Sequence, residues 1–145
     1  MKKSFLFALF AFCLLPSAFC QIKIINSTCQ KKIGETHGIT MNYFIEFKTK
    51  NSTEIRIDSV KGIADELNIE YTSIKNDKGY YIISFSQDLK KPEKCPTCRD
   101  VGKKQSNLTK GVIVYYKKID KKSSSSKVAS FKVKKFNKLP DATNP

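Results

Sequence analysis

The chain has 145 residues, five of them cysteine, and a formal net charge of +14. This length is typical of one domain with its own hydrophobic core, and it leaves too little chain for two domains. No stretch reaches the roughly 20 consecutive apolar residues that a membrane-spanning helix needs, so the sequence predicts no transmembrane segment.

The first twenty residues have the layout of a secretory signal. Two lysines come first, then a short apolar run, then the helix breaker Pro16 and small residues. The segment resembles bacterial Sec signals, so we expect residues 1–20 to be removed and the mature protein, starting at Gln21, to be secreted or periplasmic. The competing interpretation is a lipoprotein signal with a lipidated Cys20. The bulky Phe19 before that cysteine argues against it.

Apolar and polar residues alternate with a period of two along the first half of the mature chain, which predicts half-buried strands. After a first strand at Ile22–Ile25, we expect strands at Met41–Lys48, Thr53–Asp58 and Leu67–Ser73. A turn at residues 76–79 then leads into a strand at Tyr80–Phe85 and completes a hairpin. The side chains expected to face the core are Met41, Tyr43, Ile45, Phe47, Ile55, Ile57, Leu67, Ile69 and Tyr71.

Two further strands are predicted near the C-terminus. Gly111–Tyr116 is apolar on both faces and suits a central strand, and Val128–Phe136 has Ala129, Phe131 and Val133 on its inner face. Phe136 breaks that alternation by one residue, which predicts a β-bulge near Lys134–Lys135. Residues 62–67 allow one helical turn at most.

These segments make about seven short strands without a sustained helical stripe. Their rhythm resembles an immunoglobulin-like or fibronectin-type β-sandwich, which implies an all-β fold of two packed sheets. The chain departs from antibody domains because it has no tryptophan and its cysteine spacing does not match their inter-sheet bridge. A small Greek-key barrel is the alternative. We expect the sandwich to span residues 21–140 and residues 141–145 to form a tail.

Three cysteines remain after the signal is removed: Cys29, Cys95 and Cys98. In an oxidising compartment they predict a structural disulfide, either within the Cys95–Cys98 CxxC motif or from Cys29 to that loop. Two alternatives stay open. Cys29, His37, Cys95 and Cys98 together make the Cys₃His set of a structural zinc site, and a CxxC motif can also carry thiol redox chemistry. Zinc aside, we expect no cofactor.

The positive charge is unevenly distributed. Residues 21–88 hold nine basic and nine acidic residues, whereas residues 89–145 hold sixteen basic and four acidic residues. Such asymmetry can mark a surface for acidic partners, although a run of lysines is also compatible with a simple solvated surface. The lysines that we expect to gather at one end and one face of the last two strands are Lys117, Lys118, Lys121, Lys122, Lys132, Lys134 and Lys135.

No catalytic constellation stands out in the chain, and no Gly-x-Ser-x-Gly motif accompanies its single histidine, His37. The sequence therefore predicts a non-enzymatic protein with a binding or structural role at the bacterial cell envelope. Acidic polysaccharide or another polyanion is the expected partner, and other envelope proteins are further candidates. A secreted protein seldom meets nucleic acid, so we do not expect that partner. The alternative function is a metal- or thiol-dependent protein built on Cys29, His37, Cys95 and Cys98.

Overall fold

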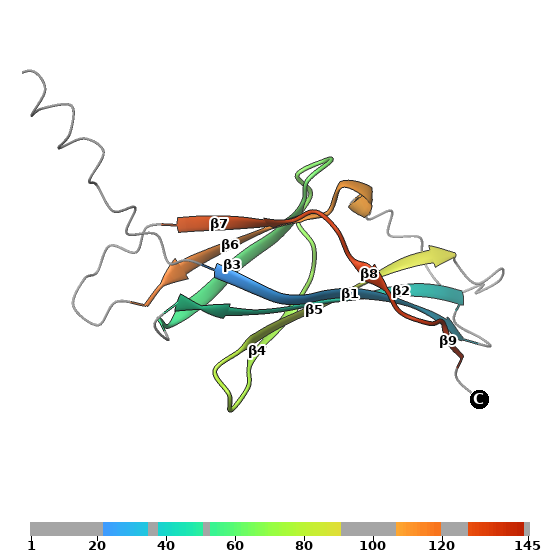
Figure 1. The fold of residues 1–145 in the computed structure, drawn as a ribbon. Coiled ribbons are helices and arrows are strands. Elements are labelled where there is room, and N and C mark those ends of the chain that lie inside the picture. The colour runs from blue at the N-terminus through green and yellow to red at the C-terminus, as the bar shows by residue number, and fades with distance from the viewer. Residues whose placement is uncertain (1–21, 35–37, 51–52, 91–106, 120–127, 144–145) are drawn as a thin grey trace, which may run out of the picture.

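The computed structural model describes residues 22–34, 38–50, 53–90, 107–119 and 128–143. Among these residues there are nine strands and one short 3-10 helix, and no α-helix (Figure 1). The strands are β1 (Ile22–Gly34), β2 (Gly38–Thr49), β3 (Ile55–Gly62), β4 (Thr72–Lys75), β5 (Tyr81–Lys90), β6 (Val112–Lys118), β7 (Val128–Val133), β8 (Asn137–Lys138) and β9 (Ala142–Thr143), and the 3-10 helix is η2 (Leu108–Lys110).

The strands form two sheets. The larger has the order β4-β5-β2-β1, and the short strands β8 and β9 both pair with the remaining edge of β1; the smaller has the order β3-β6-β7. All pairings are antiparallel except those of β8 and β9 with β1, which are parallel. Labelled by letter, β1 to β7 give the sheet orders ABED and CFG of a constant-type immunoglobulin domain. The predicted all-β sandwich with seven main strands is confirmed.

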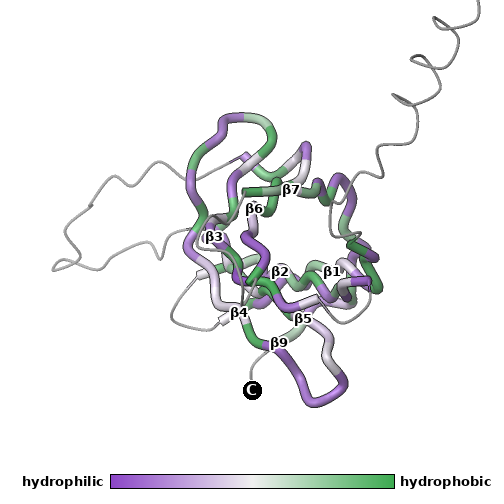
Figure 2. The backbone as a smooth tube through the Cα atoms, turned by 90° about the vertical axis from the view of Figure 1, so that its left-hand side faces the viewer, coloured by the Kyte–Doolittle hydropathy of each residue, from purple (hydrophilic) through white to green (hydrophobic). Residues whose placement is uncertain are grey.

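The two sheets lie as two layers, as Figure 2 shows, and the buried side chains between their inner faces form the core. The predicted alternation holds in β2 and β3, where Tyr43, Ile45, Phe47, Ile55 and Ile57 are buried. From the central strand of the smaller sheet, Val112, Val114 and Tyr116 meet them. Aromatic rings of both sheets pack against one another in the core. The ring centroid of Phe47 in β2 lies 5.5 Å from that of Tyr81 in β5 and 4.9 Å from that of Phe131 in β7.

The segment Leu67–Ser73 is not the strand that its alternation predicted. The ladder of β4 begins only at Thr72, and the preceding residues make a single bridge, between Asn68 and Lys61 of β3. Ile69 and Tyr71 still pack against the core, because this stretch carries the chain from the smaller sheet to the larger one. The alternation of apolar and polar residues therefore predicted correctly which side chains face the core, but it did not predict that the backbone is unpaired here.

The break of pattern at Phe136 also has a different cause from the predicted bulge. β7 ends at Val133, and the chain then leaves the smaller sheet and crosses to the larger one, where β8 and β9 pair with β1. Phe136 packs edge-on against Tyr43 during the crossing, with the ring centroids 5.0 Å apart. The expected tail at residues 141–145 also differs, since Ala142–Thr143 forms β9.

Gly111 marks the tightest approach beside this crossing. Its φ of +89° is a conformation that L side chains rarely adopt, and a Cβ built there would lie 2.0 Å from the carbonyl oxygen of Val133. Glycine at this position therefore lets the start of β6 lie directly beside the end of β7.

Candidate anion-binding site

The structure does not bring the described members of the predicted lysine group together at one end. Lys117 and Lys118 lie at the end of β6, whereas Lys132 pairs with Ile113 near the start of that strand. Because Lys117 pairs with Val128, the two positions are four residues apart on β7, or about 13 Å along the strand. Lys134 and Lys135 follow in the crossing to the other sheet, and Lys121 and Lys122 lie outside the described residues.

A different group of cations gathers at the end of the sandwich that holds Lys117. At this end β1, β3 and β7 begin while β2 and β6 finish, as the left side of Figure 1 shows. Ladder pairs link Lys23 to Lys48 and Arg56 to Lys117. We call this region the basic end, and its described cations are Lys23, Lys48, Lys50, Arg56, Lys75, Lys78, Lys117 and Lys118.

Acidic side chains neutralise only part of the basic end. Lys117 Nζ lies 2.8 Å from Asp58 Oδ1, and Lys75 Nζ lies 3.3 Å from Glu54 Oε1. The hydrogen bond from Lys117 lowers the pKa of Asp58, and the positive charge of Lys117 acts in the same direction. Four lysines of the basic end make no ion pair with another described residue: Lys23, Lys48, Lys50 and Lys78.

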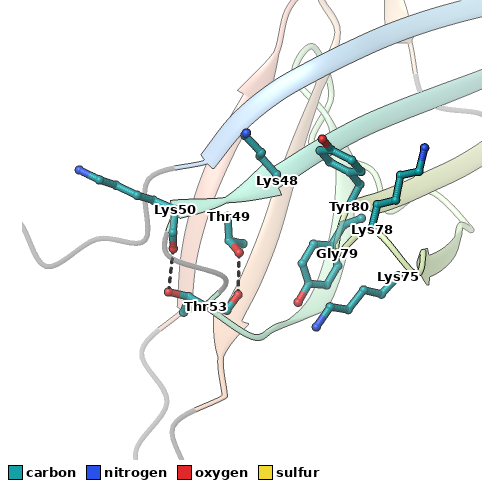
Figure 3. Close-up of a pocket in the computed structure, with 9 residues that line it drawn as sticks. Lys48, Thr49, Lys50, Thr53, Lys75, Lys78, Gly79 and Tyr80 are labelled. Carbon is teal, nitrogen blue, oxygen red and sulfur yellow. Dashed lines mark hydrogen bonds between the residues drawn. The ribbon is translucent and has the colours of Figure 1, made fainter.

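A hollow of about 450 Å³ opens at the basic end, between the end of β2 and the β4–β5 hairpin. Four lysines line it: Lys48, Lys50, Lys75 and Lys78. Figure 3 shows Lys48 and Lys78 on either side of the Tyr80 ring, with Lys50 pointing away from them. Lys75 lies with its ammonium group 5.7 Å from the ring centre of Tyr81, a cation–π contact.

Hydrogen bonds fix both rims of the hollow. On the β2 side, the buried Thr49 hydroxyl donates to the carbonyl oxygen of Thr53 at 2.7 Å, and the Thr53 hydroxyl donates to the carbonyl oxygen of Lys50 at 3.0 Å (Figure 3). On the hairpin side, the Tyr80 N–H donates to the Asn76 side chain at 2.9 Å, and Gly79 takes the positive φ that the turn requires. The lysine backbones are therefore held in place before any ligand arrives.

The net charge summed along the chain does not reveal this site. Residues 21–88 are neutral in total, yet the fold separates their charges in space. Asp65 and Glu66, for example, follow the far end of β3, where the Asp65 carboxylate accepts a hydrogen bond from the Asn107 N–H. The signal available in the sequence was that lysines flank two turns, at residues 48–50 and at residues 75–78.

Cys29 is the one predicted cysteine or histidine ligand that the structure describes. It is a half-buried free thiol that faces the same side of the sheet as its ladder partner Tyr43. His37, Cys95 and Cys98 lie outside the described residues, and so do the signal residues 1–20. Among the described residues there is no group of three or more metal-ligating side chains.

Comparison with protein-family models, with curated proteins and with solved structures gives no significant match for this chain. Within the described part of the chain, no helix has the length and apolar character needed to cross a membrane.

Proposed function

We propose that this protein is a secreted or periplasmic, non-enzymatic binding domain that holds acidic polymers at the basic end of its sandwich. One observation supports this most directly: cations from β1, β2, β3, β6 and the β4–β5 hairpin lie at the same end of the sandwich, and several of them have no acidic partner among the described residues. Acidic polysaccharide is the ligand class that fits both this charge and a cell-envelope location.

Binding of this kind is driven largely by the release of counterions from the polymer. Each lysine that replaces a bound counterion adds to the salt dependence, so the affinity should fall steeply as salt rises. Lysine is suited to the role because its ammonium acts as a mobile point charge, without the fixed geometry of an arginine fork.

The first test compares three triple variants on a heparin resin, each with three lysines replaced by glutamine and hence the same loss of charge. The basic-end variant is Lys48→Gln, Lys50→Gln and Lys78→Gln. The control is Lys32→Gln, Lys110→Gln and Lys138→Gln, away from that end. We expect the basic-end variant to elute at clearly lower salt than the control. Equal elution of the two would mean that only net charge matters, and it would contradict the proposal.

The third variant tests the lysines of β7 and the crossing, with Lys132→Gln, Lys134→Gln and Lys135→Gln. These side chains lie toward the other end of the sandwich, so we expect a smaller shift than for the basic-end variant. A larger shift would place the binding surface on β7 and would overturn the choice of the basic end.

A further inference from the structure

We infer that the hollow beside Tyr80 is a site for a single sugar ring that carries a phosphate or sulfate ester. This inference rests on the proposed function, and it adds a defined pocket and a recognised chemical unit. The hollow measures about 450 Å³, within the range of roughly 300 to 1,000 Å³ typical of small-molecule sites.

The cations of the hollow indicate the anionic part of the ligand. Lys75 is engaged by Glu54 at 3.3 Å, so its charge is partly neutralised. Lys48 and Lys78 line the hollow with Tyr80 and make no ion pair with another described residue; in the view of Figure 3 their side chains are drawn on opposite sides of the Tyr80 ring, with the two ammonium groups apart. A phosphate or sulfate ester carries its negative charge on several oxygens, and each of them can accept a charge-assisted hydrogen bond from an ammonium group.

Tyr80 indicates that the ligand contains a sugar ring. Its neighbour Tyr81, the first residue of β5, points inward, is 7% exposed and stacks on Phe47, whereas Tyr80 lies just before the strand. Tyr80 is half-buried and lines the hollow. A tyrosine ring offers an apolar face with a polar tip, which suits the mixed faces of a sugar.

The number of aromatic side chains available in the hollow favours a sugar over a nucleic acid as the ligand. Proteins that bind single-stranded nucleic acid stack successive bases on several aromatic side chains along a groove. Of the two aromatic residues that line this hollow, only Tyr80 is available, because Tyr81 is buried in the core. One available ring with lysines in the same hollow fits a ligand that has one sugar ring and one anionic group.

The rims of the hollow reduce the cost of binding. On the β2 side the Thr53 hydroxyl donates to the Lys50 carbonyl oxygen. In the hairpin the Asn76 N–H donates to the Tyr80 carbonyl oxygen at 2.9 Å, and the Asn76 side chain accepts from the Tyr80 N–H at 2.9 Å. A backbone that is already ordered has less entropy to lose when the ligand is bound.

The experiment is a ¹⁵N NMR titration of the full protein with glucose 6-sulfate and glucose 6-phosphate, with glucose, inorganic sulfate and inorganic phosphate as reference probes. We expect saturable shifts of the Thr49, Gly79 and Tyr80 amides, and an affinity about tenfold higher for each sugar ester than for its free ion, which corresponds to about 1.4 kcal/mol. Tyr80→Ala should reduce the affinity to that of the free ion. The matched control is Tyr115→Ala, which removes a half-buried tyrosine from the smaller sheet and should leave the affinity unchanged.

Several results would overturn the inference. These are sugar esters that bind no tighter than the free ions, shifts confined to other parts of the protein, or equal losses in Tyr80→Ala and Tyr115→Ala. Tighter binding of adenosine monophosphate than of either sugar ester would also overturn it, since the ring would then recognise a base. If these results appear while heparin retention persists and depends on the basic end, the proposed function stands and only the sugar site fails.

The same chemistry can come from a soluble glycan or from a lipid headgroup, and a second measurement separates the two sources. Sulfated heparin oligosaccharides are compared with vesicles that contain a lipid with a phosphorylated sugar headgroup. Competition by either probe with glucose 6-sulfate, lost in Tyr80→Ala, supports the site and identifies its source. If neither probe competes with glucose 6-sulfate, the inferred site binds neither a glycan nor a lipid headgroup, and the inference is overturned.

Discussion

Phe44 and Phe47 lie three residues apart on β2, and the two-residue period of the strand puts them on opposite faces. Phe47 is fully buried and contacts rings from both sheets, whereas Phe44 is 40% exposed. We expect Phe47→Ala to lower the free energy of unfolding by about 3 to 5 kcal/mol, because it removes buried surface and leaves a cavity. Phe44→Ala, the matched control, should cost less than about 1 kcal/mol. Urea denaturation measures both, and similar losses would contradict the assigned faces.

Tyr43 makes the free energy of unfolding depend on pH in the alkaline range. Burial raises the pKa of Tyr43 above its usual value of 10.0, and the nearby Cys29 acts in the same direction. A raised pKa means that the folded state favours the neutral phenol. Its contribution to stability is therefore complete below pH 10 and is lost as the pH rises through the folded pKa.

The prediction is that the free energy of unfolding falls above pH 10, and falls less steeply in Tyr43→Phe. The substitution also removes the hydrogen bond from the Tyr43 hydroxyl to Gln87 at 3.4 Å, which adds a loss at every pH below 10. Chemical denaturation between pH 8 and pH 11 separates the two effects. Identical slopes above pH 10 in the two proteins would exclude Tyr43 as the source.

At the scale of elements, the least expected feature is the C-terminal strap, which we define as residues 134–143. It runs parallel to β1 and covers the edge of that strand. Its bonds to β1 include the Ser27 hydroxyl to the Lys135 carbonyl oxygen at 2.8 Å and the Leu139 N–H to the Cys29 carbonyl oxygen at 2.8 Å. An uncovered edge strand is a template for pairing with another chain, so the strap protects the larger sheet.

Truncation of the protein after Phe136 tests this role. β8 and β9 are lost while Phe136 and its contact with Tyr43 remain. We expect a stability loss of about 1 to 3 kcal/mol, from a few hydrogen bonds at about 1 kcal/mol each. Amide hydrogen exchange should accelerate in β1 more than in β6, and the truncated protein should self-associate at lower concentration. Unchanged exchange in β1 would show that the strap contributes no protection.

At the scale of the whole molecule, the compartment that the protein reaches decides whether its cysteines form a disulfide. If residues 1–20 direct secretion, the mature protein begins at Gln21 and meets an oxidising compartment, where Cys95 and Cys98 can close a disulfide. Cys29 is a free thiol. We therefore predict an intact mass that starts at Gln21 and one alkylated cysteine, Cys29, when the unreduced protein is treated with iodoacetamide in denaturant. The reduced protein is the control, with three labelled cysteines. An acylated Cys20, or three labelled cysteines without reduction, would contradict the prediction.

The binding surface also belongs to the whole molecule, since no single element carries it. The basic end takes lysines from strand termini that are far apart in the chain, and the hollow joins residues 48–53 to residues 75–81. Gln21–Asp88 reads as electrically neutral in sequence, and it supplies all four lysines of the hollow. A linear count cannot detect this, because neutrality along a chain says nothing about where each charge points.

The sequence by itself determined the fold class, the hairpin at residues 76–79 and the inward faces of β2, β3 and β7. Each of these follows from local alternation and turn chemistry, which act over a few residues. Three features were decided only by the tertiary structure. Leu67–Tyr71 crosses between the sheets, the chain after Val133 pairs with the edge of β1, and the lysines of the hollow lie close together. Those outcomes depend on how distant strands pair and on the order of the strands in each sheet. Two strand ends adjacent in a sheet share an electrostatic environment whatever their separation in sequence, and no local pattern records that adjacency.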